Sequence, residues 1–265
     1  MVIPEPLRAL LFVPANRPER FTKAAAARPD AVILDLEDAV ATADKDAART
    51  ALTCGFTDLP VIVRINPTGT PWHDDDLCAV VALRPSAVML PKSENPACVA
   101  QIVGKLEGIS LLCLIESGRG MAVARSIATV PGVDRLVFGS VDYCADLGMD
   151  HKRELLLPAR SELVLASRIA RIAAPIDGVT TRLDDPAELA DDVGHAKSLG
   201  LAGKLCIHPK QVEDVKAAFA PRPEQIAWAN RVLAAGDGAV SVDGEMVDAP
   251  VRIRARSILS AAKQP

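Results

Sequence analysis

Eight short apolar runs recur along the chain and constrain its fold more than any other feature. They are rich in Val, Ile and Leu, and longer Ala-rich segments with helical spacing separate them. The runs cover residues 9–13, 31–36, 61–65, 87–90, 111–115, 136–138, 176–180 and 204–207. Several lack the alternation of apolar and polar residues, as expected of parallel strands that are covered on both faces. A strand–helix unit repeated eight times predicts an α/β fold, a (β/α)8 TIM barrel.

The segments between the runs carry the usual signals for helix ends. Asn16 and Pro18 mark one start, and Gly55 and Gly200 follow two predicted ends. The sequence predicts helices at residues 18–27, 44–54, 95–106, 120–128, 153–173, 185–199 and 209–219. An open, doubly wound sheet is the alternative, but no G-x-G-x-x-G loop follows the first strand.

About forty residues follow the eighth unit. We expect residues 1–222 to form the catalytic barrel domain and residues 223–265 a C-terminal helical extension. Within the extension, residues 223–235 and 252–262 have helical patterns, and residues 239–247 are short and mixed with a turn at Asp243 and Gly244. A segment beyond a closed barrel must pack on its own barrel or on another copy, and we expect a neighbouring subunit.

Composition excludes several classes of protein. The formal charge of −4 is spread along the chain without a basic stripe, which argues against nucleic-acid binding. No run of about 18 uncharged apolar residues suggests a membrane span, and the first residues do not read as a secretory signal. The six cysteines include no C-x-x-C pair, so we expect buried thiols in a reducing cytoplasm rather than disulfides or structural zinc.

Two acidic residues follow consecutive apolar runs. Glu116 ends the fifth run, and Asp142 lies shortly after the sixth, where we expect a strand to give way to a loop. In a parallel barrel the strand ends meet at the mouth that carries the active site. Carboxylates are hard ligands that suit Mg²⁺, Mn²⁺ or Ca²⁺, and a Mg²⁺ ion on two of them keeps positions for water or substrate. The alternative is that each acid caps the following helix or pairs with an arginine.

Arg64 and an acidic patch end two further runs. Arg64 follows Val61–Val63, where it is placed to grip a substrate carboxylate or stabilise an oxyanion. A salt bridge to Asp35 or Glu37 is equally consistent with the pattern. Alternation puts Asp35 and Glu37 on one side, with Asp38 beside them. We expect this patch chiefly to orient Arg64 and hold the waters of a metal, although it is also placed to cap the next helix.

Two more strand-end residues have chemical potential. Lys92 is a candidate Schiff-base lysine, but the neighbouring carboxylates favour an anchoring cation instead. His208 alone among the four histidines ends a strand, and a structural hydrogen bond is its commoner role. His73, His151 and His195 read as residues of loops or helix surfaces.

Eight motifs in order along the chain resemble the citrate lyase β-subunit-like family of the HpcH/HpaI aldolase superfamily. They are LLFVP at 10–14, RPERF at 17–21, ILDLEDAV at 33–40, VRINP at 63–67, LPKSE at 90–94, IESGRG at 115–120, FGSVD at 138–142 and GKLCIHP at 203–209. The resemblance implies a Mg²⁺-dependent TIM barrel that makes or breaks a carbon–carbon bond between a thioester and an oxoacid. Relatives include citrate lyase β subunits, malyl-CoA and citramalyl-CoA lyases, and a malyl-CoA thioesterase.

The resemblance also implies roles for particular residues. Glu116 and Asp142 match the Mg²⁺ ligands, with Mn²⁺ as a possible substitute, and Arg64 matches the arginine that contacts the oxoacid. The segment 246–250 is similar to a tail motif whose aspartate, here Asp248, reaches a neighbouring subunit's site as a general acid/base. A homo-oligomer, a trimer or a multiple of one, is therefore expected.

The remaining site assignments complete this set. Glu37 joins Arg64 and Asp248 as a catalytic residue. Arg17 and Arg20 lie where the family holds CoA, and we place Asp38 and Lys92 with them and Arg64 among the substrate- and CoA-binding residues.

The chain departs from the family pattern at two places. Ser140 and Val141 stand where relatives often have Thr or Pro followed by Glu, and Thr180–Arg182 replace a more apolar run. Both changes bear on the substrate, and the acyl thioester and oxoacid stay open. Two other activities also stay open: a thioesterase that uses the same metal site, and a subunit of a multi-enzyme lyase that needs partner chains.

Overall fold

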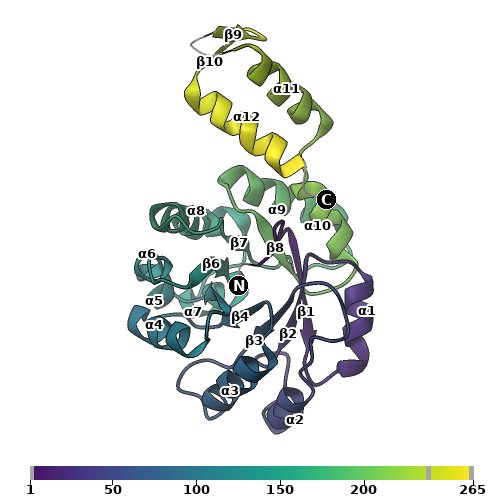
Figure 1. The fold of residues 1–265 in the computed structure, drawn as a ribbon, viewed down its shortest axis with the longest axis vertical. Helices are drawn as coiled ribbons and strands as arrows, with labels where there is room; N and C mark the ends of the chain where they lie inside the picture. Colours follow the sequence, from purple (N-terminus) through teal and green to yellow (C-terminus); the bar gives the residue numbers. More distant parts are fainter. Residues whose placement is uncertain (1–2, 237–239, 263–265) are drawn as a thin grey trace. The chain divides into compact units, whose positions relative to one another are not determined.

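The computed structural model describes residues 3–236 and 240–262, and its centre is a closed barrel of eight parallel strands (Figure 1). Each strand pairs with the next in sequence, and β8 closes the barrel on β1. The strands are β1 (Ala9–Pro14), β2 (Ala31–Asp35), β3 (Val61–Arg64), β4 (Ala87–Leu90), β5 (Ser110–Ile115), β6 (Val133–Phe138), β7 (Ile176–Asp177) and β8 (Gly203–Cys206). The predicted (β/α)8 fold is confirmed.

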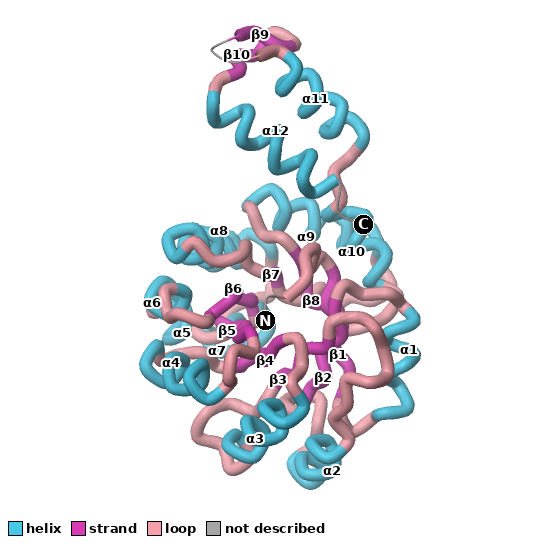
Figure 2. Tube along the Cα trace, in the orientation of Figure 1, coloured by secondary structure: helices cyan, strands magenta, loops and turns pink. Residues whose placement is uncertain are grey.

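Helices surround the barrel, as the outer ring in Figure 2 shows. After β1 come η1 (Pro18–Arg20) and α1 (Phe21–Ala26), and after β2 come η2 (Thr42–Asp44) and α2 (Lys45–Thr50). The others are α3 (His73–Leu83), α4 (Pro96–Lys105), α5 (Gly118–Ala122), α6 (Ala124–Ala128), α7 (Ser140–Leu147), α8 (Arg153–Ala170), α9 (Pro186–Leu199) and α10 (Gln211–Phe219). Asn95 caps α4, because its side chain accepts hydrogen bonds from the amides of Ala97 and Cys98.

Several elements differ from the sequence prediction, and three of them bear on the barrel. Helices α3 and α7 were not predicted. Three aspartates, Asp74–Asp76, occupy the first turn of α3, where negative charge is favourable. Helix α7 begins at Ser140, directly after Gly139, and uses residues that the apolar pattern assigned to a strand end. Strand β7 has two residues rather than five, because the chain after Asp177 leaves the ladder toward Thr180.

The barrel interior is a single apolar cluster that also sets the position of the site. Alternate residues of each strand share one face, so Leu10, Ile33, Ile62 and Leu114 belong to this cluster. Two residues further along the same four segments, and on the same face, are Phe12, Asp35, Arg64 and Glu116. These residues lie nearer the carboxyl ends of the strands. The alternation that packs the core therefore also directs these side chains into the barrel mouth.

A second compact unit, Ala217–Pro265, follows the first, Met1–Lys216. It contains α11 (Pro223–Ala234), the antiparallel strands β9 (Val240–Val242) and β10 (Glu245–Val247), and α12 (Ala249–Ala262). Its own small core consists of Ala229, Val232, Val247 and Ala255. Residue 239, the first of the predicted mixed segment, lies outside the described residues. None of the helices built from described residues is long and apolar enough to cross a bilayer.

A buried charge network joins the last two strands to the helices outside them. Arg160 of α8 donates to both carboxylate oxygens of Asp177, at 2.8 and 2.9 Å, and to Asp192 of α9 at 2.8 Å. Lys204 of β8 binds the same two aspartates at 2.9 and 2.7 Å. Burial alone would raise the pKa of Asp192, but Lys204 and Arg160 outweigh it and hold that pKa well below its usual range. The two positive and two negative charges of this network thus compensate each other.

Removing one cation from this network should destabilise the barrel. Lys204→Met leaves two buried carboxylates sharing one arginine, and we expect the free energy of unfolding to fall by about 3–5 kcal/mol in urea denaturation. Lys105→Met is the matched control, because Lys105 makes an exposed 3.4 Å ion pair with Asp74. That change should cost less than about 0.5 kcal/mol. Equal losses in the two variants would contradict a structural role for the network.

Candidate active site

A cavity of about 340 Å³ lies at the carboxyl ends of the barrel strands, within the first unit. Charged residues border it together with apolar ones. Its lining is Phe12, Asp35, Asp38, Ala39, Arg64, Leu114, Glu116, Phe138, Gly139, Ser140, Val141, Asp142, Val179, Leu205 and Ile207. The cavity therefore brings together Arg64, Asp38, Glu116 and Asp142, which the sequence placed at the mouth.

Arg64 is the centre of the charged side. Its Nε and Nη2 donate to the two carboxylate oxygens of Asp35, both at 2.7 Å, so the pair is bidentate. Its Nη1 lies 3.0 Å from Oε2 of Glu37 and 3.4 Å from Asp38. The guanidinium also lies over the Phe12 ring, 4.7 Å from its centroid. Burial lowers the pKa of Arg64, but Asp35 and Glu37 raise it more, so the side chain stays charged.

Glu37 is a buried carboxyl between two cations. Its Oε1 accepts from the Lys92 ammonium at 3.2 Å, whereas its Oε2, although close to Arg64, accepts no hydrogen bond from the described residues. Burial raises the pKa of Glu37 to about 7, and the charge of Arg64 opposes this only in part. A carboxyl with a pKa near neutrality can both take and give a proton at physiological pH.

Lys92 connects Glu37 to Glu116. Its backbone N–H donates to Oε1 of Glu116 at 2.7 Å, from a left-handed conformation with φ 47°. Partial burial lowers the pKa of the Lys92 ammonium, but Glu37 and other acids raise it above its usual value overall. A Schiff-base lysine needs a lowered pKa, so this environment favours the anchoring alternative.

Glu116 is the most deeply enclosed carboxylate of the cavity lining that lacks a cationic hydrogen-bond donor. It is 3% exposed, and burial, with the charges of Glu37 and Asp142, raises its pKa to about 8. Gly139 makes room for it: a Cβ at that position would lie 2.4 Å from the Glu116 Cβ and 2.6 Å from its Oε2. The side chain is therefore held on one side by the Lys92 amide and on the other by bare backbone.

Asp142 corrects the sequence prediction in one respect. It does not sit at a strand end, because β6 stops at Phe138 and Asp142 lies in the first turn of α7. Asp142 is half-buried and still borders the cavity together with Glu116. The helix N-terminus favours the negative charge of Asp142 at this position.

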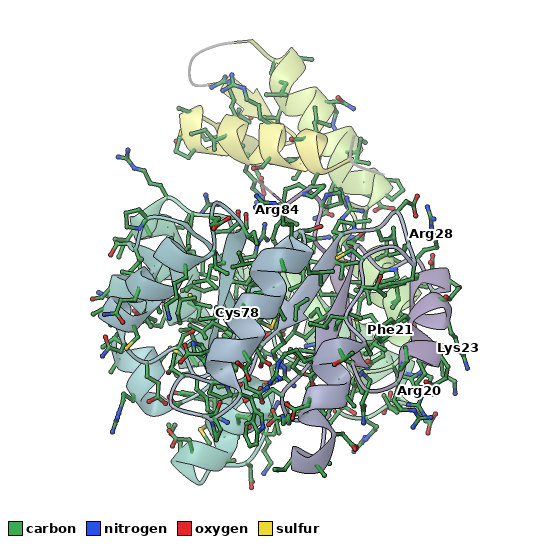
Figure 3. The ribbon with its side chains drawn as sticks, turned by 60° about the horizontal axis from the view of Figure 1, so that its bottom comes forward. Arg20, Phe21, Lys23, Arg28, Cys78 and Arg84 are labelled. Carbon is green, nitrogen blue, oxygen red and sulfur yellow. The ribbon has the colours of Figure 1, made fainter. Side chains whose placement is uncertain are left out.

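Other predicted residues lie away from this cluster. Arg17 and Arg20 are exposed residues next to α1, and Figure 3 shows Arg20 and Lys23 directed outward there. Arg17 donates to Glu19 at 2.6 Å. His208 accepts the amide of Lys210 at 3.1 Å, which is a local structural bond.

Asp248 belongs to the second unit and precedes α12. Its side chain accepts the amide of Val251 at 3.3 Å, so it caps that helix. Its role at the cavity stays a prediction.

Two contacts near the site were not predicted from the sequence. Buried Lys45 donates from Nζ to the carbonyls of Leu36 and Glu37, at 2.6 and 2.7 Å, and so fixes the loop that carries Glu37. His151, read as a surface residue, lies with Nε2 2.9 Å from the hydroxyl of buried Ser140. A lysine in a helix and a histidine in a polar loop carry no sequence signal for these contacts.

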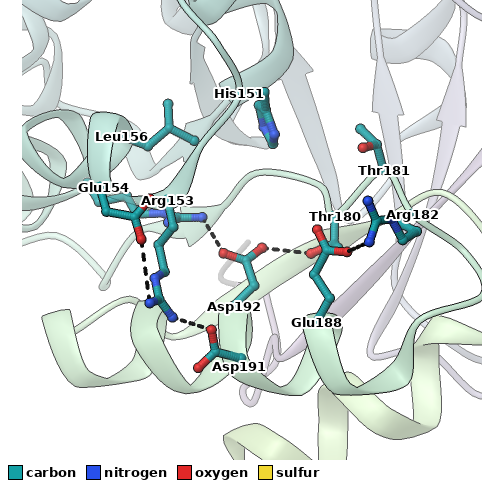
Figure 4. A pocket seen from close by; sticks show the side chains of 11 residues that line it. His151, Arg153, Glu154, Leu156, Thr180, Thr181, Arg182, Glu188, Asp191 and Asp192 are labelled. Atoms are coloured by element: carbon teal, nitrogen blue, oxygen red, sulfur yellow. Dashed lines mark hydrogen bonds and ion pairs between the residues drawn. The ribbon is translucent and has the colours of Figure 1, made fainter.

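A second, more polar cavity of about 380 Å³ lies behind that histidine (Figure 4). Figure 4 shows that charged side chains of this cavity contact other polar side chains that line it. Arg153 pairs with Asp191 and Arg182 with Glu188, and Asp192 accepts a hydrogen bond from the Thr180 hydroxyl. Ser140 borders the first cavity and His151 the second, so their contact forms part of the wall between them.

The residues present fit a divalent cation at Glu116 and Asp142. Among the described residues no three His, Cys, Asp or Glu side chains form a complete metal cage. Two oxygen ligands with room beside them are instead the arrangement in which Mg²⁺ keeps positions for water or substrate oxygens. Burial and the charges of Glu37 and Asp142 raise the pKa of Glu116 more than the Lys92 amide and Arg64 lower it, so a bound cation would stabilise the ionised form.

The Asp35–Arg64 pair should contribute far more to stability than the neighbouring Asp38–Arg64 contact. Asp35→Asn removes the bidentate charge partner and one acceptor for the amides of Glu37 and Ala39. We expect a loss of about 3 kcal/mol in the free energy of unfolding, measured in urea. Asp38→Asn, at a side chain 53% exposed, should change it by less than about 1 kcal/mol. A larger loss for Asp38→Asn would show that the pair is not the anchor.

Comparisons with known proteins agree with the fold and the motifs. A citrate lyase subunit beta-like protein of Deinococcus radiodurans is 39% identical over 97% of this chain and 98% of its own length. A (3S)-malyl-CoA thioesterase of Cereibacter sphaeroides is 31% identical over 97% of this chain and 95% of its own. The crystal structure of CitE from Mycobacterium tuberculosis in complex with magnesium, acetoacetate and coenzyme A superposes with a TM-score of 0.85, at 37% identity over 96% of this chain and 97% of that one. Residues 8–209 match the family model for HpcH/HpaI aldolase/citrate lyase, and the chain belongs to that family.

Proposed function

We propose that the protein is a Mg²⁺-dependent lyase that cleaves, or in reverse forms, a carbon–carbon bond in a 3-hydroxyacyl-CoA thioester. The products would be an acyl-CoA and an oxoacid. The observation that carries the proposal is one cavity in which a buried carboxylate without a cationic donor, Glu116, lies beside Asp142 and faces Arg64. A relative in the same family has been solved with magnesium, coenzyme A and acetoacetate, which are the three kinds of ligand that this reaction needs.

The residues divide the reaction between them. Glu116 and Asp142 would hold the cation, which supplies positive charge to the carboxylate and hydroxyl of the substrate when it is bound. Arg64 adds a fixed positive charge for the oxygen that becomes the oxoacid carbonyl. Glu37, whose pKa burial raises to about 7, would take the hydroxyl proton. The hydroxyl oxygen then becomes the carbonyl oxygen, and the electrons of the broken bond pass to the thioester as an enolate.

The enolate needs a proton to become the acyl-CoA product. We assign this transfer to Asp248 of a neighbouring copy, with residues 1–222 as the catalytic barrel and residues 223–265 packed on that neighbour in a trimer. The support is the tail motif around Asp248, together with its half-buried place at the start of α12. Arg17, Arg20, Asp38 and Lys92 would complete the thioester-binding side, and Mn²⁺ is a possible substitute for Mg²⁺.

Thioester hydrolysis by the same site is the second candidate, favoured by the relative named as a (3S)-malyl-CoA thioesterase. The two activities differ in their products. Purified protein with Mg²⁺ and malyl-CoA or citramalyl-CoA should release acetyl-CoA and an oxoacid, identified by mass. Release of free CoA and the intact hydroxyacid would support hydrolysis. Activity that appears only with added partner chains would support a subunit of a multi-enzyme lyase.

Loss of either proposed ligand should abolish metal binding without unfolding the protein. Glu116→Gln keeps an acceptor for the Lys92 amide, and Asp142→Asn is nearly isosteric. We expect Mg²⁺ affinity measured by calorimetry to fall by at least about tenfold in each variant, with turnover falling further. Asp146→Asn, one turn further along α7, is the control and should bind Mg²⁺ as the parent does. Unchanged binding in both ligand variants would exclude this metal site.

The close packing at Gly139 predicts that a side chain at this position will weaken Mg²⁺ binding. Gly139→Ala places a Cβ inside contact distance of Glu116, so the carboxylate must move. We expect a loss of about tenfold or more in Mg²⁺ affinity. Gly194→Ala in α9 is the matched control, since a Cβ there meets nothing within 4 Å, and it should raise stability by up to about 1 kcal/mol. Normal Mg²⁺ affinity in Gly139→Ala would mean that Glu116 does not bind the ion.

A further inference from the structure

The helical turn that carries Asp142 begins at a buried serine. Ser140 is the first residue of α7, it is 1% exposed, and it borders the site cavity. The carbonyl of Gly139 accepts the amide of Tyr143 at 2.9 Å, which closes the turn that contains both Ser140 and Asp142. Because this turn is closed, a displacement of Ser140 moves Asp142 with it.

A histidine from beyond the other end of α7 holds the Ser140 hydroxyl. Helix α7 ends at Leu147, and His151 follows in the loop before α8. Its Nε2 lies 2.9 Å from Oγ of Ser140. Burial lowers the pKa of His151 and Asp192 opposes this only in part, so the ring is neutral at physiological pH. A hydroxyl can donate or accept, so the bond forms with either tautomer of the neutral ring.

The main chain at Gly178 packs directly against the same serine. Gly178 follows the last residue of β7, and a Cβ there would lie 2.2 Å from the Ser140 oxygen and 2.7 Å from its Cβ. This backbone is itself fixed, because the preceding Asp177 accepts from both Arg160 and Lys204 in the buried charge network. The Ser140 side chain therefore contacts both an imidazole and a rigid segment of main chain.

A serine bonded to a histidine can also be a nucleophile with its base, and thioester hydrolysis is the second candidate function. The surroundings of Ser140 do not suit that role. A nucleophilic oxygen needs space in which the carbonyl carbon of a substrate can approach to about 3–3.5 Å. Ser140 is 1% exposed, and the Gly178 main chain occupies the space next to its oxygen. The serine–histidine pair is therefore suited to hold a turn in place rather than to attack a thioester.

We infer that Ser140, His151 and Gly178 position Asp142 as a ligand for the divalent cation. The inference rests on the proposed metal site and adds to it residues that do not touch the ion. The hydrogen bond and the main-chain contact fix the first residue of α7, and the closed turn passes this position on to the carboxylate two residues later. An ion held by two carboxylates depends on the distance between them, so a ligand on a less rigid turn binds it more weakly.

Calorimetric titration with Mg²⁺ tests this clamp. Ser140→Ala removes the hydroxyl and His151→Leu removes its partner, and we expect each change to weaken Mg²⁺ binding by about tenfold. His151→Gln keeps a hydrogen-bonding group near the position of Nε2, so its Mg²⁺ affinity should stay within about threefold of the parent value. Ser198→Ala is the control and should bind Mg²⁺ as the parent does, because the exposed Ser198 hydroxyl donates only to the carbonyl of His195 within α9.

The possible results separate the inference from the metal site on which it rests. His151 is exposed, so its replacement should not unfold the barrel, and thermal melts of all variants establish that they fold. Parent-like Mg²⁺ affinity in folded Ser140→Ala and His151→Leu proteins would overturn the inference and leave the metal site standing. Absence of Mg²⁺ binding to the parent protein would overturn both.

The double variant tests whether the serine and the histidine act as one unit. If they do, Ser140→Ala combined with His151→Leu should bind Mg²⁺ about as weakly as either single variant. Two independent contributions would instead multiply to a loss of about a hundredfold. A loss of that size would contradict the clamp.

Turnover separates a positioning serine from a nucleophilic one. A misplaced ligand raises the Mg²⁺ concentration that activity requires, so saturating Mg²⁺ should restore kcat of Ser140→Ala to within about threefold of the parent value with malyl-CoA or citramalyl-CoA. A missing nucleophile cannot be restored in this way. Activity that stays lost at saturating Mg²⁺, together with parent-like Mg²⁺ affinity, would overturn the positioning role and assign Ser140 to catalysis.

Discussion

The bidentate ion pair between Asp35 and Arg64 is the interaction on which the rest of the site depends. The two residues are register partners on the adjacent strands β2 and β3, so the ladder itself brings them together at the top of the barrel. Burying a charge without a partner costs several kcal/mol, and the 2.7 Å pair removes most of that cost for both groups. With Arg64 held in this way, its remaining nitrogen and its face over Phe12 have fixed positions, and Glu37 and the cavity are arranged around them.

Backbone geometry positions Glu116 and Asp142, the two carboxylates proposed to bind the metal. The amide of Lys92 can reach Glu116 because residue 92 adopts a left-handed conformation, and Glu116 can approach the end of β6 because residue 139 has no Cβ. The helix that begins there carries Asp142 to the same cavity. Burial raises the pKa of Glu116, and the negative charges of Glu37 and Asp142 raise it further.

The sequence predicted the parts of this arrangement that depend on periodicity. The eight short apolar runs located all eight strands, and the positions of Asp35, Arg64 and Glu116 near the ends of their runs put them at the barrel mouth, where the carboxyl ends of parallel strands meet. Asp142 was expected at the barrel mouth as a strand-end residue, but it borders the cavity from the first turn of α7. An apolar run does not reveal where a strand ends and a helix starts. The contacts of Lys45 and His151 depend on tertiary packing between segments, for which a single sequence has no pattern. The role proposed for Asp248 requires a second copy, so it stays a prediction from the family motif.

Two buried charge clusters in the same barrel show how structural and chemical roles differ. Around Lys204 and Arg160, two cations meet two aspartates, every carboxylate is paired, and the pKa of Asp192 is held low. Around Arg64 and Lys92, two cations face Asp35, Glu37, Asp38, Glu116 and Asp142, and the pKa values of Glu37 and Glu116 rise to about 7 and 8. A protein under selection for stability alone would balance the second cluster as it balances the first, since each raised carboxyl pKa means that the folded state disfavours the charged form. The excess of acid is instead what a site needs if it is to gain a divalent cation and keep a carboxyl ready for proton transfer.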